Sequence, residues 1–155
     1  MKLSTRARYA LRMMVEIARR PGADPMSMGH VAENTRISKR YLDQVAIGLK
    51  TSSLIRSMRG RGGGYQLSRP AGEISVGQII EAAIGPINVV ECVRRPDTCL
   101  KSNCCECRWV YTRINDEVTN LLSGMSLAEL ADRRGSGAAV GSLGEGYGST
   151  GCPVT

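Results

Sequence analysis

The stretch from Ile37 to Leu67 limits the possible folds of this chain more than any other part of it. It reads ISKRYLDQVAIGLKTSSLIRSMRGRGGGYQL. In its first half, apolar residues recur at the spacing of one buried helix face. These residues are Leu42, Val45, Ala46 and Leu49. Ser38 stands before them, and its side chain suits the N-cap of a helix that exposes polar and basic groups on its other face.

The second half of the stretch changes pattern after Thr51. Two short runs, Leu54–Ser57 and Tyr65–Ser68, flank the sequence RGRGGG. Short runs around a glycine-rich turn predict a β-hairpin with a basic tip. A helix with a polar face followed by such a hairpin is typical of a winged helix-turn-helix. In that fold the helix enters the major groove of DNA, and the wing follows the backbone or the minor groove.

The exposed positions of this helix and hairpin are the candidate DNA-binding residues. They are Ser38, Lys39, Arg40, Tyr41, Asp43 and Gln44 in the helix, and Ser57, Arg59, Gly60 and Arg61 in the wing. The alternative interpretation is a tight turn beside a solvated charged face. The turn before the helix, the helix itself and the basic hairpin agree with one another, and together they favour DNA binding.

The charge of the chain is unevenly distributed. The net charge is +7, but residues 1–75 hold 14 Lys and Arg against 5 Asp and Glu, whereas residues 76–155 have a net charge of −2. Double-stranded DNA is therefore the partner we expect for the N-terminal half, because neutralising phosphates releases counterions. We expect no membrane partner, because the basic residues do not lie on one lysine-rich amphipathic helix.

Further helices are predicted on both sides of the opening stretch. Before it, helices are expected over residues 5–19 and 28–34. The buried stripe of the first is Ala7, Ala10, Leu11, Met14, Val15 and Ala18. After it, a helix capped by Ser75 leads to a long helix over residues 108–122, and a short helix follows Ser126. The predicted fold class is mainly α with a small β-hairpin wing. The single histidine, His30, is expected to be structural or solvated.

Five of the six cysteines fall within sixteen residues, from Cys92 to Cys107, where helical periodicity is lost. The chain shows no apolar N-terminal run and no stretch long enough to span a membrane, so we expect a cytoplasmic protein. Disulfide scaffolding is then disfavoured, and metal or redox use of the thiols is favoured. The wide spacing lacks the paired CxxC motifs of a zinc ribbon, but it allows an iron–sulfur cluster.

The predicted long helix has an apolar stripe that needs a partner. The stripe consists of Val110, Ile114, Val118, Leu121 and Leu122. The small N-terminal domain can cover part of it, and a second copy of the helix can cover the rest. Two-fold dimerisation would also place two recognition helices on a palindromic operator. Residues 133–155 are rich in glycine and are predicted to form a flexible tail, in which Cys152 is an isolated thiol.

These motifs resemble those of the Rrf2 family of bacterial winged-helix regulators, which includes an iron–sulfur cluster regulator, a nitric-oxide-sensing repressor and a cysteine-metabolism repressor. The resemblance extends from about Met1 to Ala131. It is carried by MKLSTRARYAL at the start, ISKRYLDQV in the recognition helix, RGRGGGYQLSRP and ISVGQIIEA in and after the wing, and SLAEL near the end. It implies a dimeric, DNA-binding transcriptional regulator and not an enzyme.

Members of that family with clusters carry three cysteines before the dimerisation helix. In this chain the resemblance places them on Cys92, Cys99 and Cys105. The fourth ligand of the cluster regulator is a histidine, whose place is taken here by Arg108. Some relatives use an acidic residue of the first helix, whose place is taken by Arg8. Cys107 is therefore the expected fourth ligand, with Cys104, a small molecule or water as alternatives. The implied cofactor is a 2Fe–2S or 4Fe–4S cluster.

The sequence thus predicts a DNA-binding domain (residues 1–85), a cluster-binding loop (86–107), a dimerisation helix with a short terminal helix (108–132) and a tail (133–155). The hypothesis is a transcriptional repressor whose operator affinity depends on the cluster, because cluster loading shifts the loop and the adjoining helix. One alternative is a cluster-free regulator of the same fold that senses thiol oxidation, zinc or a protein partner. Another is a small iron–sulfur electron-transfer protein, which would have no use for the basic wing.

Overall fold

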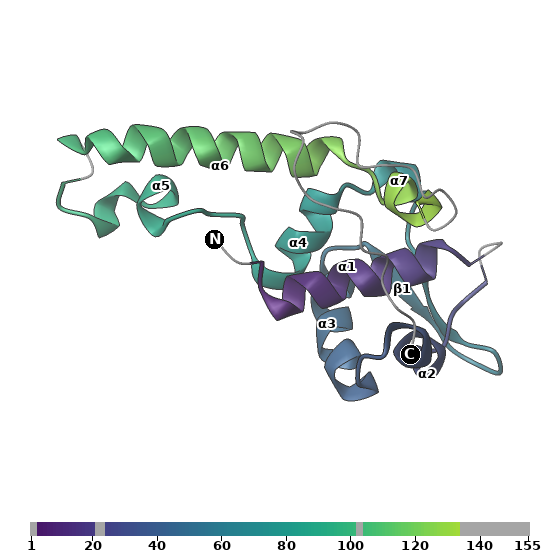
Figure 1. The fold of residues 1–155 in the computed structure, drawn as a ribbon. Helices are drawn as coiled ribbons and strands as arrows, with labels where there is room; N and C mark the ends of the chain where they lie inside the picture. The colour runs from purple at the N-terminus through teal and green to yellow at the C-terminus, as the bar shows by residue number, and fades with distance from the viewer. Residues whose placement is uncertain (1–2, 21–23, 102–103, 134–155) are drawn as a thin grey trace, which may run out of the picture.

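The long helix α6 (Glu106–Gly124) runs along one edge of the molecule and extends well beyond the body that the N-terminal helices form, with only the segment that precedes it alongside its outer part (Figure 1). The structure, a computed structural model, describes residues 3–20, 24–101 and 104–133. Within these residues the other helices are α1 (Thr5–Ala18), α2 (Met28–Thr35), α3 (Lys39–Thr51), α4 (Val76–Ile84), α5 (Glu91–Arg94) and α7 (Leu127–Asp132). The strands β1 (Ile55–Met58) and β2 (Gly64–Leu67) form an antiparallel hairpin, and 3₁₀ turns cover η1 (Ala71–Glu73) and η2 (Pro96–Thr98). The predicted fold class is therefore confirmed.

Serine side chains cap the starts of several helices. Each accepts a hydrogen bond from the backbone N–H three residues later, at Ser4, Ser27, Ser75 and Ser126. Ser38 holds the same position before α3, but its side chain makes no capping hydrogen bond. The start of α3 is instead marked by the Ser38 carbonyl, which accepts from the N–H of Leu42 at 3.1 Å. The predicted capping role of Ser38 is thus correct in position and wrong in its hydrogen bond.

Helix α1 lies at the centre of the hydrophobic core, where it packs against α4, α3, α7 and α2. Its buried apolar residues are Ala7, Ala10, Met13, Met14 and Ile17. The predicted stripe contained Leu11, Val15 and Ala18 in place of Met13 and Ile17, but these three residues are only half buried. That part of the prediction is wrong, because partners on several sides widen the covered face of α1 beyond a single stripe.

Glycine allows α3 and α4 to pack closely. A Cβ atom on Gly48 of α3 would lie 2.3 Å from the backbone oxygen of Ala82 in α4. A side chain at this position would therefore separate the two helices. The predicted buried stripe of α3 is confirmed, with Leu42, Val45, Ala46 and Leu49 all in the core.

The C-terminal helix α7 joins the core formed by the N-terminal helices. Leu127 is fully buried there, and its N–H donates to the carbonyl of Ile74 at 2.8 Å. A capping box begins the helix: the carboxylate of Glu129 accepts from the backbone N–H of Ser126 at 2.7 Å and from its hydroxyl at 2.9 Å. These hydrogen bonds, the backbone one first, lower the pKa of Glu129.

The segment between α4 and α6 has more structure than the sequence predicted. It contains α5 and η2 and lies beside the first part of α6 (Figure 1), so the segment that the sequence predicted as a loop over residues 86–107 is partly helical. Polar contacts with α6 order this segment locally, which periodicity alone does not reveal. None of the helices in the described part of the chain combines the length and the apolar composition that spanning a lipid bilayer requires. Cys152 and the predicted tail beyond Arg133 lie outside the described residues.

Candidate DNA-binding surface and cysteine segment

The face of α3 that points away from the core carries the polar residues that the sequence predicted. Ser38, Lys39, Arg40, Asp43 and Gln44 are all exposed. The opposite face of α3 packs tightly against α4 at Gly48, and this packing fixes the position of the helix that carries these side chains. A helix with one buried stripe and one polar face is the form that enters a major groove.

Tyr41 differs from these neighbours because it is half buried. Its ring meets the ring of Tyr9 in α1 edge to face. The guanidinium carbon of Arg12 lies 6.0 Å from the centroid of the Tyr9 ring. Tyr41 therefore attaches the N-terminal end of α3 to α1, a packing role that the sequence analysis did not assign to it.

Ile47 also lies on the outer face of α3, and sequence reasoning missed it. Its exposure is 64% although it is a large apolar residue. It follows Gln44 by three residues and Arg40 by seven, so it shares their side of the helix. This spacing, outside the buried stripe, is the signal that could have found it. Apolar side chains at such positions can contact the methyl group of thymine.

The wing tip depends on glycine geometry. Gly60 and Gly62 have φ values of 107° and 85°, in the region that favours glycine. A Cβ on Gly63 would lie 2.4 Å from the carbonyl oxygen of Met58. Arg59 and Arg61, on this turn, are exposed, as is Ser57 on β1. The tip therefore presents two cations on a backbone without bulky neighbours, which allows close approach to a phosphate or a narrow groove.

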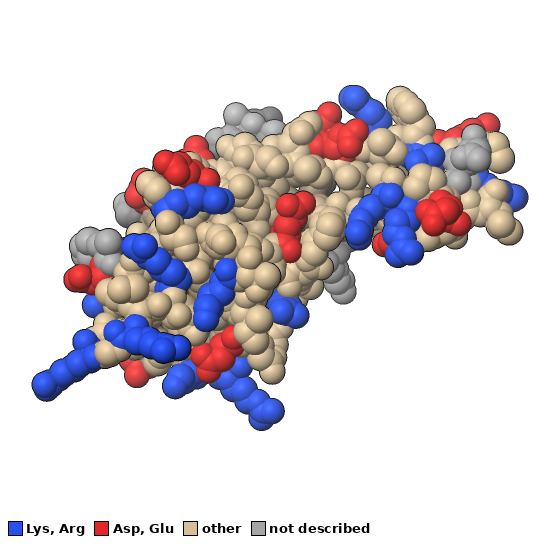
Figure 2. Space-filling view, turned by 180° about the vertical axis from the view of Figure 1, so that it is seen from behind, with Lys and Arg blue, Asp and Glu red and all other residues tan. Residues whose placement is uncertain are grey.

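The hairpin is held against the start of α2. Its register pairs Ile55 with Leu67 and Met58 with Gly64, so each strand is shifted by one residue from the predicted run. Beside it, Met26 and Tyr65 exchange two backbone hydrogen bonds of 2.8 Å. Figure 2 shows Lys and Arg side chains projecting from the lower left part of the molecule, where the hairpin and α3 lie. The candidate DNA-binding residues of helix and wing thus occupy neighbouring parts of one domain.

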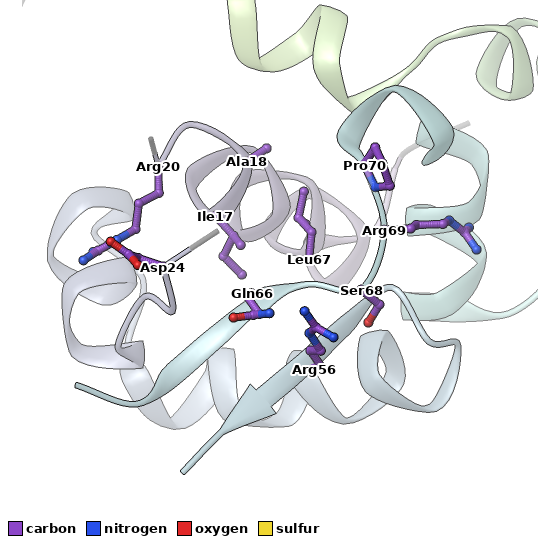
Figure 3. A pocket seen from close by; sticks show the side chains of 10 residues that line it. All are labelled: Ile17, Ala18, Arg20, Asp24, Arg56, Gln66, Leu67, Ser68, Arg69 and Pro70. Carbon is purple, nitrogen blue, oxygen red and sulfur yellow. The ribbon is translucent and has the colours of Figure 1, made fainter. Parts of the chain in front are cut away.

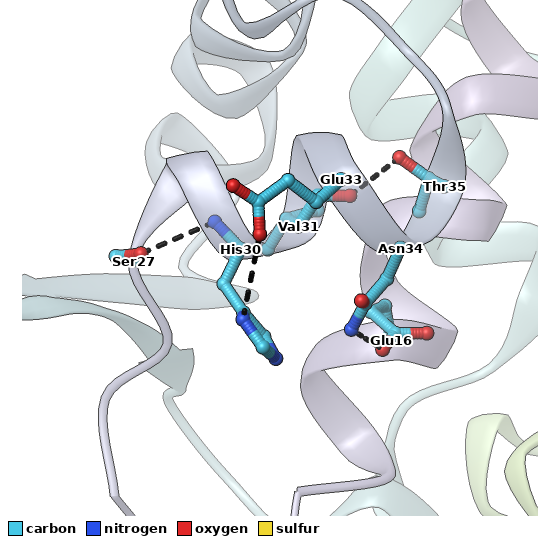
Figure 4. A network of polar contacts seen from close by, with 7 residues as sticks. All are labelled: Glu16, Ser27, His30, Val31, Glu33, Asn34 and Thr35. Atoms are coloured by element: carbon cyan, nitrogen blue, oxygen red, sulfur yellow. Dashed lines mark hydrogen bonds and ion pairs between the residues drawn. The ribbon is translucent and has the colours of Figure 1, made fainter.

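His30 belongs to a polar network around α2. His30 is exposed, with its Nδ1 atom 4.0 Å from the carboxylate of Glu33 (Figure 4). The nearby Glu16 of α1 is buried and accepts a hydrogen bond of 2.6 Å from the amide of Asn34. This bond joins α1 to α2, so Glu16 has a structural partner.

The cysteines lie on different short elements between α5 and α6. Cys92 is in α5, Cys99 follows η2, Cys105 is the N-cap of α6, and these three are half buried. Cys104 and Cys107 are exposed, and the Cys104 thiol lies 3.7 Å from the carbonyl oxygen of Lys101. All five are free thiols.

The donor atoms of this segment suit a soft metal or an iron–sulfur cluster, because thiolates are the ligands that these groups prefer. The arrangement of the side chains does not match such a site. Among the described residues, no group of three or more His, Cys, Asp or Glu side chains is placed to hold a metal ion. The structure therefore does not bring the predicted ligands Cys92, Cys99, Cys105 and Cys107 to one point, and cluster binding by them stays a prediction.

Two side chains of α6 hold the cysteine segment, defined as residues 86–107, alongside this helix. The Nε atom of Arg108 donates to the carbonyl of Cys92 at 3.2 Å. The amide oxygen of Asn115 accepts from the N–H of Val89 at 3.1 Å. Arg108 and Asn115 are seven residues apart and so lie on one side of the helix. Because of these two contacts, a shift of the backbone near Cys92 would also displace side chains of α6.

Helix α6 exposes much of its predicted apolar stripe. Exposure is 45% for Val110, 42% for Ile114 and 64% for Leu121, and no residue within α6 is buried. Leu122, in contrast, packs against Ala7, Val76 and Ile80. The stripe is thus divided: its C-terminal end contacts the core beside α4, and most of its length faces outward. Trp109, at 71% exposure, adds apolar area outside the predicted stripe.

Comparisons with known proteins identify this arrangement. The sequence profile of the Rrf2 family, described as an iron-dependent transcriptional regulator, matches residues 3–133. The transcriptional regulator CymR of Bacillus subtilis is 34% identical over 131 residues, which cover 84% of this chain and 90% of CymR. The regulator IscR of Pectobacterium atrosepticum is 31% identical over 134 residues, which cover 86% of this chain and 81% of IscR. The solved structure of B. subtilis CymR, named as the global cysteine regulator, superposes with a TM-score of 0.71 at 33% identity, covering 86% and 98% of the two chains.

Proposed function

This chain belongs to the Rrf2 family of transcriptional regulators and is not an enzyme. We propose that it binds a palindromic DNA operator as a homodimer and acts as a repressor. We further propose that the cysteine segment, by holding an iron–sulfur cluster, controls its operator affinity. The observation that carries the DNA-binding part is the polar face of α3 beside a glycine-rich wing that exposes Arg59 and Arg61.

In the proposed complex, α3 enters the major groove. Gln44 and Asp43 have side chains that hydrogen-bond base edges, whereas Lys39 and Arg40 can neutralise phosphates near the start of the helix. Arg59 and Arg61 reach the backbone or minor groove from the wing. The division of charge between the two halves of the chain supports this orientation, because the excess of cations lies in the half that contains α3 and the hairpin.

The proposed homodimer rests on the outward face of α6. Val110, Ile114 and Leu121 are large, exposed apolar residues, and they recur along one side of a helix that projects beyond the core. A second copy of α6 would cover them in a two-fold interface. Such an interface would place two α3 helices on the two halves of a palindrome.

The proposed cluster rests on the cysteines and on the family description. Five thiols within sixteen residues supply enough soft ligands, and the family is described as iron-dependent. When bound, a cluster would supply redox chemistry and sensitivity to iron supply. The described arrangement would have to change for the thiols to converge. Arg108 and Asn115 attach the backbone near Cys92 to α6, so such a change would reach the proposed dimer helix.

A second candidate is a cluster-free regulator that responds through its thiols. Two observations favour it: the cysteine side chains of the described residues do not converge on one point, and the similar CymR is named as the global cysteine regulator. Exposed thiols such as Cys104 and Cys107 are accessible to oxidants. In this alternative, DNA binding by α3 and the wing is unchanged, and only the signal differs.

Anaerobic purification followed by iron and acid-labile sulfide analysis separates the two candidates. A cluster regulator would contain both elements in a fixed ratio, with a visible absorption spectrum that is lost together with them. Colourless protein without iron or sulfide, obtained from cells supplied with iron, would contradict the cluster and favour the thiol mechanism. Operator binding measured on the same samples tests whether either state controls DNA affinity.

A further inference from the structure

A cavity of about 400 Å³ opens between the C-terminal end of α1 and the base of the hairpin. One side of it is apolar and is formed by Ile17 and Ala18 of α1, Leu67 of β2 and the adjacent Pro70 (Figure 3). The volume lies within the range of sites for small molecules, about 300–1,000 Å³. None of the residues that line it is a candidate DNA-binding residue.

The opposite side of the cavity is polar and basic. Arg56 of β1 and Gln66 of β2 are paired across the hairpin, and Gln66 is only 8% exposed. Figure 3 shows the Arg56 guanidinium between the side chains of Gln66 and Ser68. Arg20 also lines the cavity, together with Asp24, the one carboxylate among the described residues that line it. Cations therefore outnumber anions around the space.

We propose that this cavity binds a small organic anion, namely a carboxylate attached to a short apolar body. The carboxylate would bind the Arg56 guanidinium through charge-assisted hydrogen bonds, with Gln66 and Ser68 as further donors. The apolar body would cover Ile17 and Leu67. A DNA phosphate shares the anionic chemistry but has no group for the apolar wall. The wall therefore favours a free organic anion over the DNA backbone.

The ligand site is placed to act on the wing. Arg56 precedes the wing residue Arg59 by three positions, on the strand that leads into the turn. A ligand that connects Arg56 to α1 would restrict the hairpin relative to the core, and with it the position of Arg59 and Arg61. The expected consequence is a change in operator affinity. This consequence rests on the proposed function, whereas ligand binding itself does not.

Binding is tested on the full-length protein without DNA, with sodium hexanoate as the probe at constant ionic strength. Backbone amide NMR shifts of Leu67 and Ser68 should change with hexanoate and saturate. Hexanol, which lacks the charge, and sulfate, which lacks the apolar body, should each bind at least about tenfold more weakly. Absence of saturable shifts with hexanoate would overturn the proposal. Equal binding of hexanol would remove the role of Arg56, and equal binding of sulfate would identify a phosphate contact instead.

Two arginine variants locate the site. Arg56→Gln should weaken hexanoate binding by about tenfold or more, because it removes the charged donor. Arg59→Gln removes the same charge outside the cavity lining and should leave hexanoate binding unchanged. Thermal unfolding checks that both variants are folded, and Arg20→Gln provides a second lining variant, which should also weaken binding. An equal effect of Arg56→Gln and Arg59→Gln would show general charge attraction and contradict the site.

The effect on the wing is measured separately by titrating a selected operator with and without saturating hexanoate. The proposal expects operator affinity to change in the parent protein and to be insensitive to hexanoate in Arg56→Gln. Hexanoate binding without any change in operator affinity would contradict the coupling to the wing. A protein that binds hexanoate but no selected operator would contradict the proposed function and leave the ligand site intact.

Discussion

Tyr9 of α1 and Tyr41 of α3 meet edge to face, with 5.3 Å between their ring centroids and an interplanar angle of 82°. The contact joins the start of the proposed recognition helix to the helix at the centre of the core. Tyr41 immediately follows Lys39 and Arg40, so the orientation of these cations depends on how firmly this end of α3 is held. The tyrosine pair therefore helps to fix the position in which α3 would contact DNA.

Replacing Tyr9 with leucine should loosen α3 without removing any proposed DNA contact. The loss of the aromatic pair should lower the free energy of unfolding by about 0.5–1.5 kcal/mol, and operator affinity should fall with it. Chemical denaturation and fluorescence anisotropy with labelled operator measure the two effects. Tyr111→Leu, a half-buried tyrosine on α6, is the control for DNA affinity. Unchanged operator affinity in Tyr9→Leu would show that the pair does not position α3.

The hairpin approaches the chain before α2 closely enough to require glycine. A Cβ on Gly64 would lie 2.2 Å from the carbonyl oxygen of Met26. Gly64→Ala should therefore destabilise the protein by about 1–3 kcal/mol, because the hairpin must move away. Gly72→Ala is the matched control, since its Cβ would meet no atom within 4 Å. Equal unfolding midpoints for the two variants would contradict the close approach.

The α3 face and the wing could be predicted from the sequence because their signals are local. Leu42 and Leu49 keep helical spacing within one element, and the glycines after Arg59 define a turn without reference to the rest of the chain. The stripe of α1 could be predicted only in part. Burial of Met13 and Ile17 depends on several partner helices, whose positions are not encoded in the spacing of α1 itself.

The cysteine segment, too, could be predicted only in part from the sequence. The number and spacing of its thiols are visible in the sequence, but the contacts of Arg108 with Cys92 and of Asn115 with Val89 join residues sixteen and twenty-six positions apart. Such pairs follow from tertiary packing. Ile47 was missed for a simpler reason. It is an apolar residue, and the residues of α3 that were predicted to contact DNA were the polar and basic ones.

Introducing a charge into the outward stripe of α6 should weaken the proposed dimer. Ile114→Glu would bury an unpaired carboxylate in the interface, which costs far more than the apolar area lost. Sedimentation velocity over a range of concentrations should show a shift towards monomer. Asn120→Glu adds the same charge on another side of α6 and should leave association unchanged. A monomeric parent protein, or an unaltered Ile114→Glu dimer, would refute the assignment.

Serine substitutions test the proposed cluster ligands one at a time. Replacement of Cys92, Cys99 or Cys105 should abolish the chromophore of anaerobically purified protein, because serine is a poor ligand for iron–sulfur clusters. Replacement of Cys107 should weaken or alter the spectrum, and replacement of Cys152 should have no effect. An intact spectrum in Cys105→Ser together with its loss in Cys104→Ser would move the third ligand by one residue.

The proposed binding of operator DNA by α3 and the wing is tested by the affinity of Arg59→Ala for a selected operator. The parent protein should bind with an affinity that falls as salt rises, and Arg59→Ala should lose about 1–3 kcal/mol of binding free energy. Arg113→Ala, which removes an exposed charge on α6, should bind like the parent. If Arg59→Ala binds as tightly as the parent across the salt titration, the wing does not contact DNA and the proposed complex is wrong.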